Sequence, residues 1–278
     1  MKRFLVVSSR GIGDALILHI VSHHLREAGF DVTTSTPHHF GRWFSGYQFG
    51  TATDCDAIFL QHDNTPESRA IHALDKPIYT FYGSHLLEKH GPLRMGRDYV
   101  CDPNRTMVDN VVTSLQTLFG ITATKENGLK PFPGLIHRRN KKRVAIHTTS
   151  ADASKNWPEA KFLRVAQWLA SEGYEPEFLP HFPSLEDLVS YIYESGSFIG
   201  NDSGPGHIAS CLKIPHLIIG RSKRQMQFWR PGWTEGEVLV PPSWIPNWKG
   251  FRLRETHWRR FITINHVIKR FKTNVLCN

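Results

Sequence analysis

The sequence predicts an α/β protein made of two Rossmann-like domains that face each other across a cleft. Short apolar strands alternate with amphipathic helices in both halves of the 278-residue chain, a pattern typical of βαβ units. Each half also contains a strand–glycine turn–helix, around Gly11 and around Gly204. The polar, Pro- and Lys-containing segment 122–140 separates the halves. We expect domains over 1–130 and 131–255, followed by a basic helix over 256–278.

The first half begins with the apolar strand 3–7 and the glycine turn 8–13, after which Asp14 opens a helix. That helix has an apolar face and ends at Gly29. The turn has only two glycines, Gly11 and Gly13, so the dinucleotide fingerprint G-x-G-x-x-G is incomplete. Further strands are expected over 32–34, 57–61 and 78–82, and helices over 67–74 and 108–119, the last stopped by Gly120.

The second half repeats this alternation. A strand is expected over 143–147, a helix over 160–172 and a short strand over 177–179. The stretch 198–220 predicts a strand, a tight glycine turn, a small-residue helix stopped by Pro215, and a second buried strand. Residues 256–272 are expected to form a basic helix.

Composition limits the possible functions. The formal net charge of +9 favours an anionic partner. The basic residues are dispersed and match no nucleic-acid-binding motif, so we do not expect the partner to be a nucleic acid. No window is long and apolar enough for a membrane span, and the N-terminus predicts a strand rather than a signal peptide. The four cysteines have no C-x-x-C spacing, which favours reduced thiols and a cytoplasmic location.

No metal site is expected from the sequence. His19 and His23 are four residues apart without an H-E-x-x-H pattern, and the pair His23-His24 has no evident ligand set. The only D-x-D motif, at 54–56, precedes a strand and so belongs to the amino edge of the sheet. We expect it to be a solvated turn.

The turn after residue 199 suggests a ligand. Glycines allow backbone N–H groups to approach an anion, and a helix N-terminus attracts negative charge. Asp202 would repel a phosphate there, so it is expected to accept hydrogen bonds from sugar hydroxyls. The alternative is that Asp202 or Ser203 simply caps the helix.

The segment G-N-D-S-G-P-G-H-I-A-S at 200–210 resembles the signature of glycosyltransferase family 9, the bacterial lipopolysaccharide heptosyltransferases, close to G-x-D-[ST]-G-x-x-H-x-A-A. Only Ser210 departs from it. The resemblance implies a GT-B fold whose second domain binds a nucleotide-sugar donor and whose last helix packs back on the first domain. The implied donor-binding residues here are Asp202, Ser203, Gly204, Gly206 and His207.

Two further segments are similar to motifs of this family. The first turn implies that Asp14 is the catalytic base, although an aspartate at a helix start is also a common N-cap. The order of a strand, Thr148-Thr149 and K-x-W-P-x-x-x-F implies that Thr148, Thr149 and Lys155 contact the donor's phosphates. The alternative is that these are turn residues with a solvated lysine.

The family's ribose-binding loop has no counterpart here, because the strand at 177–179 leads directly into 180–188. The nucleotide is therefore not fixed by the sequence. The basic loop 83–97 lies in the half without the donor motif, so Arg94 and Arg97 are expected to bind an anionic acceptor.

Together these features predict an inverting, metal-independent and cofactor-free glycosyltransferase. The expected donor is ADP-heptose, and the expected acceptor is a glycolipid such as a lipopolysaccharide precursor at the cytoplasmic face of the inner membrane. Two alternatives stay open: a Rossmann-type nucleotide-dependent oxidoreductase and a catalytically silent nucleotide-sugar binding protein.

Overall fold

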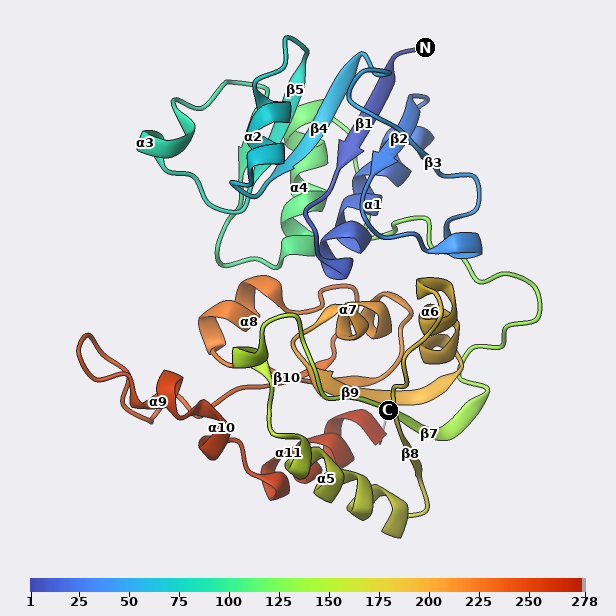
Figure 1. The fold of residues 1–278 in the computed structure, drawn as a ribbon, viewed down its shortest axis with the longest axis vertical. Coiled ribbons are helices and arrows are strands. Elements are labelled where there is room, and N and C mark those ends of the chain that lie inside the picture. The colour runs from blue at the N-terminus through green and yellow to red at the C-terminus, as the bar shows by residue number, and fades with distance from the viewer. Residues whose placement is uncertain (277–278) are drawn as a thin grey trace. The chain divides into compact units, whose positions relative to one another are not determined.

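The computed structural model describes residues 1–276 and divides them into two compact units, Met1–Phe132 and the chain from Pro133 onward (Figure 1). The division lies within the polar segment 122–140. Cys55, Cys101 and Cys211 are free thiols, whereas the fourth cysteine, Cys277, lies outside the described residues.

The first unit is built on a six-stranded parallel sheet with the order β3-β2-β1-β4-β5-β6. Strand β1 is central, with Leu5 beside Thr33 of β2 on one side and beside Ile58 of β4 on the other. The strand order therefore reverses direction at β1. The strands are β1 (Arg3–Val7), β2 (Asp31–Ser35), β3 (Gln48–Phe49), β4 (Ala57–His62), β5 (Ile78–Tyr82) and β6 (Asp98–Val100).

Helices cover both faces of this sheet. The long helices α1 (Ile12–Glu27) and α4 (Met107–Phe119) pack together on one face. Helix α2 (Pro66–His72) connects β4 to β5, and the strands from β4 onward are added to the opposite side of β1 from β2 and β3. The right-handed crossover rule therefore places α2 on the other face of the sheet. The short elements are η1 (Gly41–Phe44) and α3 (Leu87–His90). Gly120 ends α4 with φ of 69°, as expected of a glycine stop.

The second unit has a five-stranded parallel sheet with the order β11-β10-β9-β7-β8. Strand β9 is buried along its whole length and brings the predicted glycine turn to the carboxyl edge. The strands are β7 (Asn140–His147), β8 (Glu175–Phe178), β9 (Ser195–Asn201), β10 (His216–Ile219) and β11 (Glu237–Leu239). The helices up to β11 are η2 (Ala153–Lys155), α5 (Glu159–Ser171), α6 (Leu185–Tyr193), α7 (Gly204–Cys211) and α8 (Lys223–Trp229).

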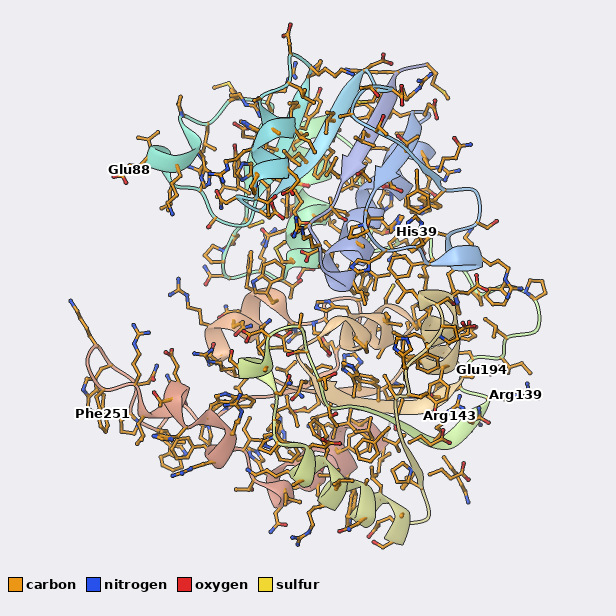
Figure 2. The ribbon with its side chains drawn as sticks, viewed as in Figure 1. His39, Glu88, Arg139, Arg143, Glu194 and Phe251 are labelled. Carbon is orange, nitrogen blue, oxygen red and sulfur yellow. The ribbon has the colours of Figure 1, made fainter. Side chains whose placement is uncertain are left out.

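Strand β7 begins three residues before the predicted start. Its first three residues, 140–142, are polar and do not alternate with apolar residues, so periodicity does not reveal them. Arg139 forms an ion pair with Glu194 (4.0 Å), and Arg143 donates to the Ser195 hydroxyl and stacks on the Tyr191 ring (Figure 2). These side chains fix the pairing of β7 with β9.

The segment 256–278, expected as one basic helix, is broken in its described part. It consists of the end of α9 (Leu253–Thr256), α10 (Trp258–Phe261), α11 (Ile264–Phe271) and a π-helical turn, η3 (Lys272–Leu276). Its apolar residues lie in the core of the second unit, against α5 and β11. The core members are Trp258, Ile262, Val267, Phe271 and Val275.

Among residues 1–276, no helix combines the length and apolar character needed to cross a membrane.

Candidate functional site

The turn between β1 and α1 positions Asp14. Helix α1 begins at Ile12 with Gly11 in the cap position, so Asp14 is the third helical residue and is not the N-cap. Its carboxylate reaches back to the Gly11 backbone, as the third residue does in a capping box. A Cβ on Gly11 would lie 2.4 Å from Asp14 Oδ2, so a larger residue at position 11 would push the carboxylate out of this position.

Gln61, which the sequence analysis did not identify, orients Asp14. It is the second-to-last residue of β4 and is buried. Its Oε1 accepts from the Ser9 backbone N–H (3.1 Å), so its amide nitrogen points the other way and donates to Asp14 Oδ1 (2.6 Å). Asp63 lies in the same network, accepting from the Ser9 hydroxyl (2.9 Å). The missed signal was Q-H-D at the carboxyl end of a buried strand.

The surroundings of Asp14 suit a proton acceptor. Burial raises the pKa of its carboxyl above the ordinary value, with a further increase from the negative charge of Asp63, while the hydrogen bonds from Gln61 and Gly11 oppose this. A carboxylate with a raised pKa holds an abstracted proton more readily.

A cavity of about 330 Å³ lies beside this network at the carboxyl ends of β1, β2 and β4. Its lining includes Ser8, Arg10, Gln61, Asp63 and Thr65. The strand order reverses at β1, and such switch points are where open α/β sheets bind ligands. The first unit therefore combines an oriented carboxylate with an adjacent cavity lined by both polar and apolar side chains.

Acceptor binding by Arg94 and Arg97 stays a prediction, and both side chains already have partners within the first unit. Arg94 forms an ion pair with Asp98 (2.7 Å) and donates to the Thr80 hydroxyl and the Ile78 carbonyl. Arg97 lies over the Tyr79 ring. These partners belong to the amino halves of β5 and β6, whereas Asp14 lies at the carboxyl edge of the sheet. The same is true of the D-x-D motif, whose Asp54 and Asp56 are exposed just before β4.

In the second unit, Lys155 and Asp202 come together. Lys155 ends η2 and its Nζ lies 3.0 Å from Asp202 Oδ2, although 47 residues separate them. Asp202 follows β9 and its side chain is only 6% exposed, while that of Lys155 is 31% exposed. Gln225 of α8, not identified from the sequence, also donates to Asp202 (3.0 Å). Lys155 is thus held at the carboxyl edge of this sheet.

A second network joins the ends of β7 and β9. The Ser203 hydroxyl donates to the Asn201 carbonyl (3.1 Å), so it accepts from His147 Nδ1 (3.0 Å). The other ring nitrogen of His147 lies 3.3 Å from the Thr149 hydroxyl. Burial lowers the pKa of His147 to about 4, so this ring is neutral at pH 7. Ser203 occupies the cap position of α7, but its side chain does not cap the helix.

Asn201 fixes the loop after β7. Its side chain donates to the Thr148 carbonyl (2.6 Å) and accepts from the Trp157 backbone N–H (2.8 Å). Thr148 and Lys155 are thereby tied to the end of β9. Arg221 reaches the same loop by donating to the Ser154 hydroxyl (3.2 Å). Phosphate contact by Thr148, Thr149 and Lys155 stays a prediction.

Helix α7 begins at Gly204 and brings small residues against the sheet. A Cβ on Gly206 would lie 2.6 Å from Ile218 Cδ1, so glycine is needed for this close packing. His207 is buried, its Nδ1 has no hydrogen-bond partner, and burial lowers its pKa to about 4. Its ring packs edge-on to Trp233. His207 thus packs beneath the turn, and donor contact by this residue stays a prediction.

Comparison with known proteins finds relatives of the same kind as the sequence motifs indicate. No protein-family model matches the sequence. Lipopolysaccharide heptosyltransferase 3 of Escherichia coli K12 is 29% identical over 133 residues, 38% of this chain and 37% of that protein. Lipopolysaccharide heptosyltransferase 1 of Campylobacter coli is 27% identical over 110 residues, 29% of this chain and 32% of that protein. The chain spans about a third of the length of these curated relatives.

Solved structures match over nearly the whole chain. The glycosyl transferase family 9 protein from Veillonella parvula has a TM-score of 0.68 at 18% identity, covering 100% of this chain and 98% of its own. E. coli heptosyltransferase WaaC with ADP has a TM-score of 0.71 at 13% identity, covering 98% of this chain and 99% of its own. At these identities the likeness shows a shared fold. The chain is thus similar in part of its sequence to lipopolysaccharide heptosyltransferases, and it shares the fold of a glycosyl transferase family 9 protein and of WaaC.

Proposed function

We propose that this protein is an inverting glycosyltransferase that moves heptose from ADP-heptose to a lipopolysaccharide core precursor. The observation that carries the proposal is the Asp14 carboxylate, oriented by Gln61 beside a cavity of mixed polar and apolar lining at the carboxyl edge of the first sheet. The similarity to heptosyltransferases supports the choice of sugar and acceptor. WaaC has been solved with ADP and with ADP-2-deoxy-2-fluoro heptose, which supports ADP as the nucleotide.

The proposed reaction is a single displacement. The two units would face each other across a cleft, as in a GT-B enzyme, and bring the acceptor hydroxyl to the donor's anomeric carbon. As the new C–O bond forms, Asp14 takes the hydroxyl proton and the bond from the anomeric carbon to the diphosphate breaks. Attack on the face opposite the leaving group inverts the anomeric configuration. The electron pair of the broken bond leaves with ADP.

The second unit would bind the donor. Lys155 carries the positive charge for the diphosphate, and the N-terminus of α7 at Gly204 adds backbone N–H groups and a favourable helix dipole. Asp202, already paired with Lys155, would accept hydrogen bonds from sugar hydroxyls with its remaining lone pairs. Thr148 and Thr149 would add hydroxyl contacts to the phosphates. No metal or organic cofactor takes part in this scheme.

The acceptor would bind in the first unit. Its expected anionic groups match the net charge of +9, and the cavity beside Asp14 includes the exposed Arg10. This location replaces Arg94 and Arg97, which lie at the other edge of the sheet. Peripheral contact with the inner-membrane surface would bring the enzyme to a glycolipid acceptor.

A ligand panel followed by a transfer assay tests the function. Melting temperatures are measured with ADP, UDP, GDP, NAD⁺ and ADP-heptose, since a ligand at about 100 times its dissociation constant adds about 2.7 kcal/mol of stability. We expect stabilisation by ADP and ADP-heptose, and ADP release that requires acceptor. Stabilisation by NAD⁺ alone would favour the oxidoreductase alternative. Donor binding with no transfer to any core precursor would favour a silent binding protein.

A further inference from the structure

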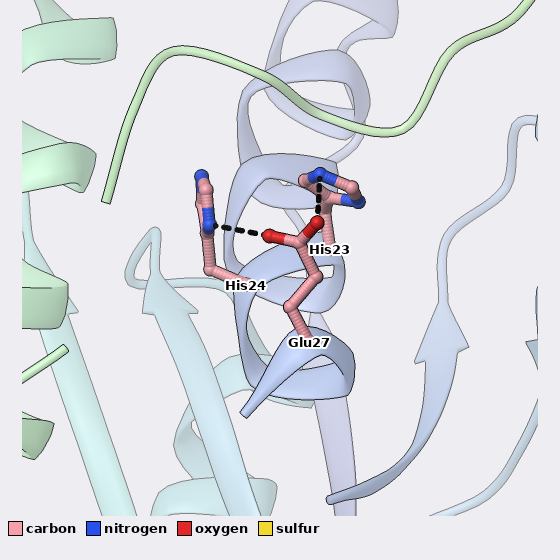
Figure 3. Close-up of side chains that lie close together, drawn as sticks. All are labelled: His23, His24 and Glu27. Carbon is pink, nitrogen blue, oxygen red and sulfur yellow. Dashed lines mark ion pairs between the residues drawn. The ribbon is translucent and has the colours of Figure 1, made fainter. Parts of the chain in front are cut away.

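Helix α1 carries three potential metal ligands in its last two turns. His23, His24 and Glu27 project to one side, and the Glu27 carboxylate lies between the two rings (Figure 3). Glu27 Oε1 is 3.3 Å from His23 Nε2, and Glu27 Oε2 is 3.2 Å from His24 Nδ1. All three ligand atoms lie within 4.8 Å of one another. The third ligand missing from the sequence analysis is thus Glu27, one turn after the histidine pair.

Both histidine rings also contact oxygen atoms through the nitrogen that does not face Glu27. His24 Nε2 lies 3.1 Å from the Thr124 carbonyl oxygen, and His23 Nδ1 lies 3.4 Å from the Tyr47 hydroxyl, which donates to the Asn127 carbonyl. His24 Nε2 also accepts from the Thr124 backbone N–H (3.2 Å), and its Nδ1 faces Glu27. If His23 donates its Nδ1–H to Tyr47, its Nε2 presents a lone pair toward Glu27. Metal-binding histidines are commonly oriented by such partners.

The His23 end of the cluster is not an ordinary hydrogen bond. The His23 side chain is only 14% exposed. Its Nε2 has no hydrogen-bond partner of acceptable geometry, although Glu27 is nearby. A second carboxylate, Glu126, lies 3.9 Å from the same nitrogen. Two imidazoles and two carboxylates are a donor set suited to a late first-row divalent cation.

We propose that His23, His24 and Glu27 form a structural Zn²⁺ site, with Glu126 able to supply a fourth ligand. Side-chain rotation would bring the three ligand atoms to the Zn–N and Zn–O distances of about 2.0–2.2 Å. The two histidines and Glu27 belong to α1, whereas Glu126 and Thr124 belong to the segment that leaves the first unit. The cation would therefore fasten this segment to α1.

The site is separate from the proposed chemistry. His23 lies nine residues after Asp14 on the same helix, about 13 Å away along its axis at 1.5 Å per residue. Asp14 is at the carboxyl edge of the sheet, and the histidine pair is near the other end of α1. The cation is thus expected to affect the stability of the first unit and to leave the transfer step intact.

Metal titration of the tag-free, chelator-treated full-length protein tests the site. We expect one equivalent of Co²⁺ to give the strong visible absorption of a low-coordinate N/O site, and Zn²⁺ to displace it and raise the melting temperature. Glu27→Gln and His23→Gln should each weaken Zn²⁺ at least about tenfold in calorimetry, and Tyr47→Phe about tenfold through the lost support of His23. His181→Gln, at an exposed histidine of the second unit, is the matched control.

Two results would overturn the proposal. One is the absence of Co²⁺ or Zn²⁺ binding at micromolar concentration. The other is unchanged binding in both Glu27→Gln and His23→Gln. Glu27 is 57% exposed, so its variant should fold, and its metal-free melting temperature verifies this. X-ray absorption of the zinc-loaded wild type provides an independent check, since it should show two imidazole ligands; a site with fewer would contradict the assignment.

Discussion

Replacing Asp14 with asparagine separates a catalytic base from a structural carboxylate. The wild-type carboxylate accepts hydrogen bonds from both Gln61 and the Gly11 backbone. An amide has one oxygen, so one of these donors would face the new NH₂ group instead. The lost hydrogen bond costs about 0.5–1.5 kcal/mol of folding free energy.

Removal of the buried charge offsets part of that cost. The folded-state pKa of Asp14 is raised above 3.8 mainly by burial, so the folded chain binds this proton more tightly than the unfolded chain does. The carboxylate therefore destabilises the wild type increasingly as pH rises from 3.8 through the raised value. At pH 7 the Asp14→Asn variant is free of this penalty, so we expect its stability to lie within about 1 kcal/mol of the wild type.

Turnover should change far more than stability. General-base catalysis contributes about 10²–10⁴-fold, so Asp14→Asn should lower turnover at least about a hundredfold, while the calorimetric Kd of ADP holds. Wild-type turnover should increase with pH through the raised pKa of Asp14. Asp75→Asn, at an exposed aspartate of the same unit, is the control. Near-normal turnover in Asp14→Asn, with an unchanged melting temperature, would refute the role of Asp14 as the base.

Four other outcomes follow from the structure. Lys155→Ala should weaken ADP binding by about 1.5–3 kcal/mol in calorimetry, with partial recovery in Lys155→Arg, whereas an unchanged Kd would exclude the phosphate contact. Arg94→Ala should lower the urea-unfolding free energy by about 1–3 kcal/mol, because it leaves Asp98, only 2% exposed, without its partner; a raised acceptor KM with normal stability would contradict its placement at the amino edge. Transfer should continue in excess chelator at room temperature, and activity lost to EDTA and restored by Mg²⁺ or Mn²⁺ would reveal a catalytic metal. His207, whose folded pKa is lowered to about 4 by burial, should make unfolding easier as pH falls from 6.5 toward 4 and should show no NMR titration between about pH 5 and 8.

Local pattern was sufficient for most elements that carry the candidate site. Strands β1 and β5 were predicted with the observed bounds, because each is an apolar run ended by turn residues. The glycine turn before α7 was recognised for the same reason. Short edge strands such as β3, with two exposed residues, have no apolar signal, so only their pairing in the folded sheet reveals them.

The candidate site depended more on long-range contacts. The resemblance to family motifs pointed to Asp14 and Lys155, but the partner that orients each of them, Gln61 and Asp202, is 47 residues away in the chain. Charge pattern also did not reveal the ion pair of Arg94 with Asp98, because the basic loop starts at the carboxyl edge of the sheet and ends at the amino edge. Sequence spacing does not encode which edge a loop residue reaches.

The end of the chain has a consequence for the donor loop. The Trp157 indole donates to the Ile262 carbonyl (3.0 Å), and Arg259 donates to three carbonyls of the loop around Lys155, those of Ala153, Ser154 and Asn156. The loop that would contact the diphosphate is therefore shaped by residues more than a hundred positions later. During synthesis, this loop can take its final form only after Arg259 and Ile262 have emerged from the ribosome, so donor binding would report that this later segment has folded onto the loop.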